Sequence, residues 1–184
     1  MTSSQAIDTT KEWIQQFIIR YNICPFAARS VMNHEIYFFC SDHVDIESQL
    51  LDLVVVCNQL VSATSEEITN AFLIFYNCES SFEEFLVLED AGSMLLEEKE
   101  LDLDLQLVGF HPQFRYADEL DDDPSNLTNR SPLPMMHIIK SEIMNKAILS
   151  HPDIESVPER NKTLLQSMKK DDLEEIYQMI FRRS

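Results

Sequence analysis

The sequence predicts an α/β protein with a small, mainly parallel sheet of about three or four strands, flanking helices and a helical C-terminal region. Two observations support this fold class. Short segments rich in β-forming residues alternate with longer segments of helical periodicity, the order expected when helices connect parallel strands. The 184 residues fit the usual size of one domain, and no repeat or linker divides them. We therefore expect residues 1–184 to form a single α/β domain.

The first half of the chain predicts two strands among three helical segments. Apolar residues from Trp13 to Tyr21 fall on one helical face, and Thr9 or Thr10 is the expected cap. Periodicity and β-propensity then predict, in order, a short helix, a strand, a helix and a buried strand, over residues 26–32, 35–40, 45–61 and 71–76.

The second half predicts one more strand and four helices around a long loop. Ser81 is the expected cap of a helix over residues 82–98, and leucines alternate with polar residues over 101–111 as on a half-buried strand. The irregular stretch 112–134 precedes a helix predicted over 134–149 and two further helices. An apolar stripe on the last helix favours core packing, with an oligomer interface as the alternative.

Composition and charge exclude several classes of partner. The chain has 14 Lys and Arg against 32 Asp and Glu, a net charge of −18, which repels nucleic acid and anionic membrane surfaces. No apolar run is long enough to cross a membrane, and the N-terminus lacks the basic flank of a signal peptide. Four well-separated cysteines fit reduced thiols. These features predict a cytoplasmic protein.

Glycine content argues against nucleotide-binding motifs. The chain contains only Gly92 and Gly109, whereas phosphate-binding loops and dinucleotide fingerprints need several glycines. We therefore expect no nucleotide cofactor.

The most polar irregular segment lies between His111 and His137. It follows the third predicted strand, and ligands of open parallel sheets bind beyond the carboxyl ends of the strands. Long loops in compact domains are often functional. We therefore expect the working site in this segment.

Three residues of this segment are candidate catalytic groups. His111 and His137 are the expected acid–base pair, because unperturbed histidine titrates near neutral pH. Asp122, within an Asp-Asp-Asp run, would orient a histidine or bind a divalent cation. The alternative is a solvated acidic turn, and the run lacks the glycine and glutamate of an EF-hand.

A second group of polar residues suggests anion binding. Arg130 offers a planar fork for phosphate or carboxylate, and Asn126, Asn129, Ser131 and Lys140 are the expected additional substrate-binding residues. The alternative is structural, with Asn129 and Ser131 capping a helix while Arg130 pairs with a loop aspartate. Both interpretations remain open from the sequence.

Cys24 is a candidate thiol outside this segment. It precedes Pro25 at the expected start of a short helix, where the helix dipole lowers a thiol pKa. An amphipathic helix rather than a strand comes before it, unlike in thioredoxin-like folds. A buried, inert thiol is therefore the favoured interpretation, and redox chemistry is the alternative.

Several motifs together resemble an uncharacterised bacterial family, domain-of-unknown-function family 1415. They are Asn-Ile-Cys-Pro-Phe-Ala at 22–27, Phe-His-Pro at 110–112, Asp-Asp-Pro-Ser-Asn-Leu-Thr-Asn-Arg-Ser-Pro at 122–132, and Val-Pro-Glu-Arg-Asn at 157–161. The resemblance implies a bacterial cytosolic protein but no activity. Lys140 stands where relatives are expected to carry arginine, which keeps the charge and loses the bidentate fork.

Two functions remain from the sequence. The first is an enzyme, a hydrolase or group transferase, that acts on a small anionic metabolite at the polar His/Asp/Asn/Arg segment. The alternative is a non-catalytic binding or adaptor protein in which the Asp–Asn–Arg network is structural. Neither function specifies an oligomeric state.

Overall fold

The computed structural model describes residues 1–64, 67–150 and 156–181. Its centre is a four-stranded sheet in the order β1-β2-β4-β3, with β1 at Ile36–Ser41, β2 at Asn70–Phe75, β3 at Leu105–Phe110 and β4 at Met135–Lys140. β1 pairs with β2 in parallel, and β4 is antiparallel to both of its neighbours. The α/β class is confirmed, but the sheet is mixed, so the expectation of a mainly parallel sheet was wrong.

The strand that makes the sheet mixed lies where we expected the start of a helix over 134–149. β4 instead occupies the centre of the sheet, where His137 pairs with Phe72 on one side and Val108 on the other. Met135, Met136 and Ile138 are fully buried there. A short apolar run of this kind has the same pattern in a buried strand and in a buried helix, so periodicity could not separate them. The helix α5 begins only at Ser141 and extends to Ser150.

The three remaining strands run in one direction. Because β4 is antiparallel to both β2 and β3, the strands β1, β2 and β3 all point the same way. Their carboxyl ends therefore share one edge of the sheet, as predicted, and the polar loop after β3 starts from this edge.

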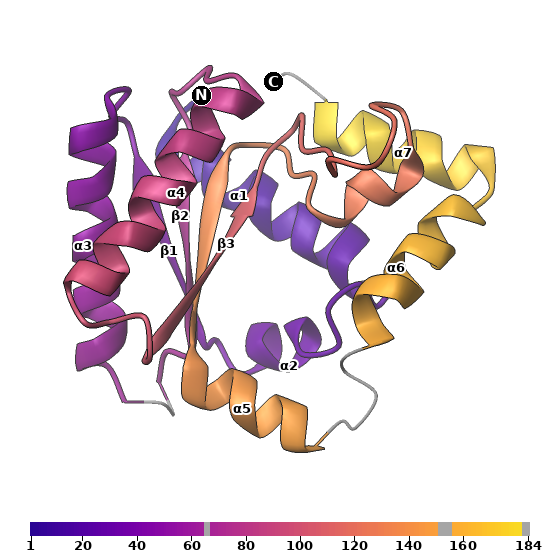
Figure 1. The fold of residues 1–184 in the computed structure, drawn as a ribbon. Coiled ribbons are helices and arrows are strands. Elements are labelled where there is room, and N and C mark those ends of the chain that lie inside the picture. Colours follow the sequence, from indigo (N-terminus) through magenta and orange to yellow (C-terminus); the bar gives the residue numbers. More distant parts are fainter. Residues whose placement is uncertain (65–66, 151–155, 182–184) are drawn as a thin grey trace.

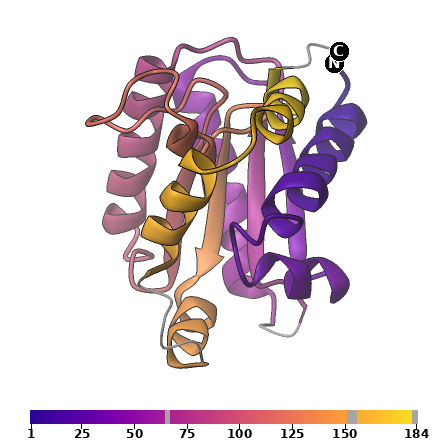
Figure 2. The same cartoon turned by 90° about the vertical axis from the view of Figure 1, so that its right-hand side faces the viewer.

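Helices cover both faces of the sheet (Figures 1 and 2). On one face lie α3 (Ile46–Ser62) and α4 (Phe82–Glu98). The other face carries α1 (Ser3–Trp13) with its π-helical continuation η1 (Ile14–Ile19), together with α6 (Val157–Gln166) and α7 (Lys170–Phe181). The short α2 (Ala27–Met32) and α5 lie near the amino-terminal ends of β1 to β3 (Figure 1).

Alternation along the strands divides the core in two. Leu73, Phe75 and Ile138 pack with α3 and α4, whereas Phe72 and Ile74 pack with α1, η1, α6 and α7. This separation decides which predicted site residues can meet, because a residue and its neighbour on a strand face opposite cores.

The first helix begins earlier than expected. Thr2, rather than Thr9 or Thr10, is its N-cap, and Thr2 forms a capping box with Gln5. Thr10 lies inside the helix, fully buried, and its hydroxyl donates to the Ala6 carbonyl. The first turns are polar and mostly exposed, so they show no apolar stripe from which the start could be recognised. Within the described ranges, no helix combines the length and the hydropathy needed to cross a membrane.

Candidate functional site

The polar loop between His111 and His137 is held by its own side chains. The Asn126 side chain is fully buried; its carbonyl oxygen accepts the Tyr116 N–H at 2.9 Å, and its amide donates to the Leu120 carbonyl at 2.7 Å. The Ser131 hydroxyl, also fully buried, donates to the Leu133 carbonyl at 2.6 Å. Both side chains therefore form hydrogen bonds with backbone groups of the loop itself.

Arg130 also fastens this loop. Its Nε–H donates to the Phe114 carbonyl at 2.8 Å, and its Nη2 donates to the Asp121 carbonyl at 2.6 Å. The side chain is largely buried, and this burial lowers the pKa of the guanidinium. Two of its five donors therefore hold backbone carbonyls of the loop, and the carboxylate of Asp121 pairs with Arg115 instead.

His111 is a satisfied core residue. Its Nδ1 accepts the Gln113 N–H at 3.1 Å, which leaves the proton on Nε2, and Nε2 donates to the Ser80 carbonyl at 3.2 Å. The ring packs between Phe82 and Phe85 of α4, and burial lowers its pKa to about 4. At neutral pH this imidazole is uncharged and has both nitrogens occupied.

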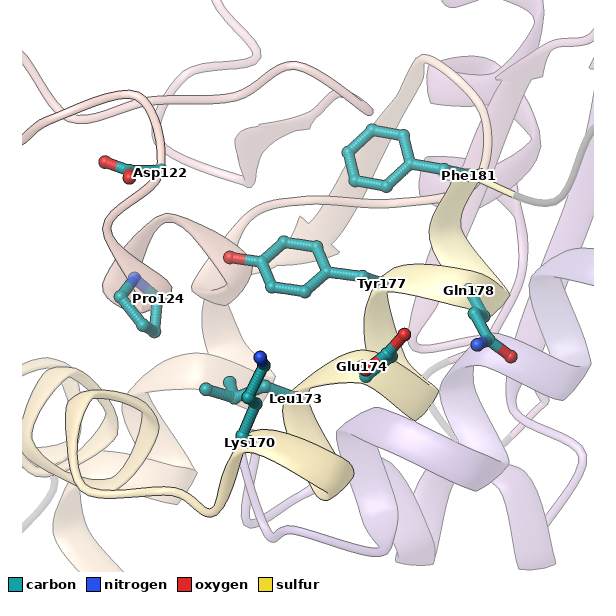
Figure 3. A pocket seen from close by; sticks show the side chains of 8 residues that line it. All are labelled: Asp122, Pro124, Lys170, Leu173, Glu174, Tyr177, Gln178 and Phe181. Carbon is teal, nitrogen blue, oxygen red and sulfur yellow. The ribbon is translucent and has the colours of Figure 1, made fainter.

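Among the described residues, neither Asp122 nor Lys140 forms a hydrogen bond with that ring. Asp122 is exposed and borders an open trough of about 850 Å³ between η2 (Pro124–Thr128) and α7, where the Tyr177 hydroxyl points toward the side of Asp122 and Pro124 (Figure 3). Lys140, at the end of β4, donates to the Ala63 carbonyl at 2.7 Å, at the C-terminus of α3.

Two of the three aspartates at 121–123 have separate structural roles. Asp121 pairs with Arg115, and Asp123 caps η2 by accepting the Ser125 N–H at 2.8 Å. In the part of the chain that the structure describes, no three His, Cys, Asp or Glu side chains are grouped as metal ligands.

His137 faces the opposite core from His111. It projects from β4 toward α1, where its ring stacks on Phe72 with centroids 4.2 Å apart and planes 1° from parallel. His111 packs on the α4 side, so the sheet separates the two histidines that we expected to work as a pair.

His137 lines a partly enclosed cavity of about 260 Å³, which we call the aromatic cavity. The cavity lies between the sheet and the helices α1, η1, α2, α5 and α6. Phe72 and Phe110 form part of its wall on the sheet, Trp13 faces both of these rings in edge-on contacts, and Cys24 and Asn129 also border it. The structure thus brings together Cys24, Asn129 and His137 from the predicted set, and places the others elsewhere.

Trp13 carries the most unusual polar atom of this cavity. Its side chain is 1% exposed, and its indole N–H has no hydrogen-bond partner among the described residues. Leaving a buried donor unpaired costs about 1–3 kcal/mol. Trp13 also stands where the α-helix changes into the π-helix η1, a rare form that occurs frequently at functional sites.

Cys24 borders the same cavity as a protonated thiol. Burial raises the pKa of Cys24, and hydrogen bonds from the backbone of Phe26 and Ala27 oppose this only in part. The local environment therefore favours the inert interpretation of this cysteine.

Sequence reasoning missed Trp13, Phe72 and Phe110 as site residues. Each has an apolar or aromatic side chain on a predicted core face, which is the usual signature of packing. Trp13, the only tryptophan in the chain, departs from this signature in one atom, its indole N–H, which has no hydrogen-bond partner in the described residues. No sequence pattern shows whether a buried donor finds a partner.

Comparisons with known proteins give a family and nothing further. Residues 5–175 match the family model described as "Protein of unknown function (DUF1415)". No curated protein and no solved structure matches the chain significantly.

Proposed function

The chain belongs to the DUF1415 family, whose description names no activity, and we propose from its geometry that it binds a small neutral molecule in the aromatic cavity. The observation that carries the proposal is the cavity itself, a partly enclosed volume of about 260 Å³ walled mainly by aromatic and aliphatic side chains. The indole N–H of Trp13 has no partner in the described residues but is almost wholly enclosed, so it offers no donor to a molecule in the cavity.

The size and lining of the cavity favour a compact, largely apolar ligand. An apolar cavity of ~150 Å³ is enough to hold benzene, and the aromatic cavity measures about 260 Å³. Aromatic and aliphatic side chains dominate its wall, and a few polar groups interrupt them. This pattern is typical of small-molecule sites.

The charge of the wall favours a neutral ligand over an anionic one. No Asp, Glu, Lys or Arg is among its described lining residues. Moving a charged group out of water without a partner costs several kcal/mol, so an anion would be bound poorly here. Arg130, the expected anion anchor, holds two backbone carbonyls of the loop instead. We therefore propose a neutral ligand in place of the anionic metabolite expected from the sequence.

Binding without catalysis fits this site better than hydrolysis or group transfer. Burial lowers the pKa of His137 to about 3, so the ring is uncharged near neutral pH and is a weak base. The Cys24 thiol is protonated there, because burial raises its pKa. The two side chains supply hydrogen bonding and shape, and neither provides a strong base or a thiolate.

Calorimetric titration with small probes of matched size tests the proposal. We expect toluene and benzamide, which are neutral, to bind at least about tenfold more tightly than benzoate or benzylammonium, a difference of ~1.4 kcal/mol. Equal binding of the charged probes, or no binding of the neutral ones to the folded protein, would contradict it.

A pair of variants in α2 locates the binding. Ala27 lines the aromatic cavity, whereas its neighbour Ala28 is exposed. Ala27→Leu should fill part of the cavity and weaken toluene binding, and Ala28→Leu should leave it unchanged. If the two variants bind alike, the probes occupy another site.

A further inference from the structure

Three flat rings stand side by side across one face of the sheet. Phe38, Phe72 and His137 are register partners on β1, β2 and β4. The rings of Phe38 and Phe72 have centroids 5.9 Å apart and planes 13° from parallel, and those of Phe72 and His137 have centroids 4.2 Å apart and planes 1° from parallel. Neighbouring strands lie about 4.8 Å apart, so side chains in register can stack in this way. We call these three residues the ring stack.

The two ends of the ring stack differ. At the β1 end, the Lys11 ammonium lies over the Phe38 ring, 5.3 Å from its centroid. At the other end, the register partner of His137 on β3 is Val108, which has no ring. Phe110, two residues further along β3, has its centroid 6.4 Å from that of His137, but its ring is tilted by 50° and is not stacked on it. Among the described residues, the face of His137 toward β3 therefore carries no stacked ring.

This face of His137 opens into the aromatic cavity. Phe72 covers the opposite face, and the side-chain oxygen of Asn70 lies 2.9 Å from Nε2 at the ring edge. His137 is nevertheless partly exposed, whereas Phe72 is only 5% exposed. Val108 is partly exposed as well, and both residues line the cavity. The accessible space therefore lies against the uncovered face of His137 and above Val108.

The fold holds His137 in one orientation. Stacking on Phe72 fixes the plane of the imidazole, and Asn70 fixes its rotation in that plane. The Asn70 amide donates to the Thr69 hydroxyl at 2.9 Å, which turns the Asn70 oxygen toward His137. A ring that is already held in place loses little conformational entropy when a ligand packs against it.

From this open end we infer that the ligand carries a flat aromatic ring, which stacks on the free face of His137 and extends the ring stack above Val108. The inference rests on the proposed function, because it names the chemical class of the molecule that the aromatic cavity binds. A stacked aromatic pair strengthens binding by roughly twofold to tenfold beyond the burial of its area, and a saturated ring of similar size does not gain this contribution.

Benzyl alcohol and cyclohexylmethanol form a matched pair of probes. Both are neutral and have the same number of non-hydrogen atoms, but only benzyl alcohol has a flat aromatic ring. Cyclohexylmethanol leaves water more readily, so the quantity to compare between proteins is the ratio of the two dissociation constants from calorimetric titrations. We expect His137→Leu, which removes the ring, to shift this ratio about fivefold against benzyl alcohol.

Two further variants serve as controls for this shift. His137→Phe keeps a flat ring against Phe72 and should keep a preference for benzyl alcohol close to that of the wild type. Ile143→Val, at another lining position, trims one methyl group and leaves every ring in place, so the ratio should not change. Circular dichroism establishes that each variant is folded.

Ring-current shifts in the wild-type protein provide a second measurement, which needs no folded His137→Leu. Protons that lie over the face of an aromatic ring resonate upfield. Benzyl alcohol stacked on His137 should therefore shift the Cδ2 and Cε1 protons of this imidazole upfield and saturably, whereas cyclohexylmethanol should produce no such upfield shift. The signals of His137 are identified by their loss in His137→Phe.

The outcomes distinguish the inference from the proposed function. If the ratio is the same in the wild type and in folded His137→Leu, the aromatic class is overturned while binding in the cavity stands. Imidazole protons of His137 that do not move upfield at saturating benzyl alcohol would also overturn it. If neither probe binds the folded wild-type protein, the proposed function itself fails.

Discussion

The polar loop after β3 and the aromatic cavity differ in how their polar atoms are used. In the loop, Arg130, Asn126 and Ser131 hold backbone groups of neighbouring residues. In the cavity, far fewer polar groups are present, yet Trp13 has a buried donor with no partner in the described residues. A polar side chain whose hydrogen bonds are complete stabilises the fold and has no group left for a ligand. Each region holds one buried polar atom without a partner in the described residues, the Ser125 hydroxyl in the loop and the Trp13 indole N–H beside the cavity. The regions therefore differ in their lining, which is polar and self-bonded in the loop and mainly apolar around the cavity.

The largest expected effect is a fall in the free energy of unfolding, caused by a substitution that disrupts the loop and leaves the cavity intact. Arg130→Met removes two hydrogen bonds from a charged, largely buried donor and leaves the carbonyls of Phe114 and Asp121 without it. We expect the free energy of unfolding to fall by about 3 kcal/mol, measured by urea denaturation.

Arg115→Met is the matched control in the same loop. Its side chain is 47% exposed and forms only surface ion pairs with Glu83 and Asp121, so the loss should stay below about 1 kcal/mol. Toluene should bind both folded variants as it binds the wild type. Equal destabilisation by the two changes would show that Arg130 does not hold the loop.

A comparable loss of folding stability is expected at acid pH, because the pKa of His111 differs between the folded and the unfolded chain. Its folded pKa of about 4 lies below the unfolded value, so between the two the unfolded chain binds a proton that the folded chain does not. Stability is therefore lost as the pH falls from ~6.5 toward 4, by about 3 kcal/mol in total.

Denaturation series at several pH values measure this loss. Replacement by His111→Gln should reduce the slope of the unfolding free energy by about 1 kcal/mol per pH unit near pH 5. The exposed His34, substituted His34→Asn to suit its positive φ of 57°, is the control and should leave the slope unchanged. An unchanged slope in His111→Gln would mean that this imidazole titrates normally.

The smallest expected effect is kinetic and concerns Cys24. Because burial raises its pKa, the thiol should react with iodoacetamide at pH 7 more slowly than an unperturbed cysteine, and faster as the pH rises. Mass spectrometry assigns the modified site, and Cys24→Ser removes its signal. Benzamide should slow the reaction further, since the thiol borders the cavity. Rapid labelling at pH 7 would instead support the redox alternative.

Much of the fold could be predicted because most elements carry a clear local pattern. Ser81 caps α4 as expected, and the alternating leucines before Phe110 form a strand, although it begins at Leu105 rather than Leu101. β4 was missed because a central strand buried on both faces has no alternation, and its sequence Met-Met-His-Ile-Ile fits a helix equally well. Pairing with β2 and β3, which no local pattern encodes, decided its form.

The candidate site was less predictable for a different physical reason. His137, Asn129 and Cys24 were singled out from the sequence and do meet at one cavity, although they lie on separate elements. Trp13 was identified only as part of an apolar stripe. Its place on the cavity wall depends on how α1 packs against the sheet, and only the folded structure determines that.

The most direct test of the account follows the indole N–H of Trp13 in a ¹H–¹⁵N correlation spectrum. The chain has a single tryptophan, so this group gives one resolvable signal. Our account predicts that benzamide and toluene both shift the indole signal saturably, because Trp13 lines the cavity that these probes fill. An indole signal that stays in place at saturating benzamide would contradict the claim that Trp13 marks the binding site.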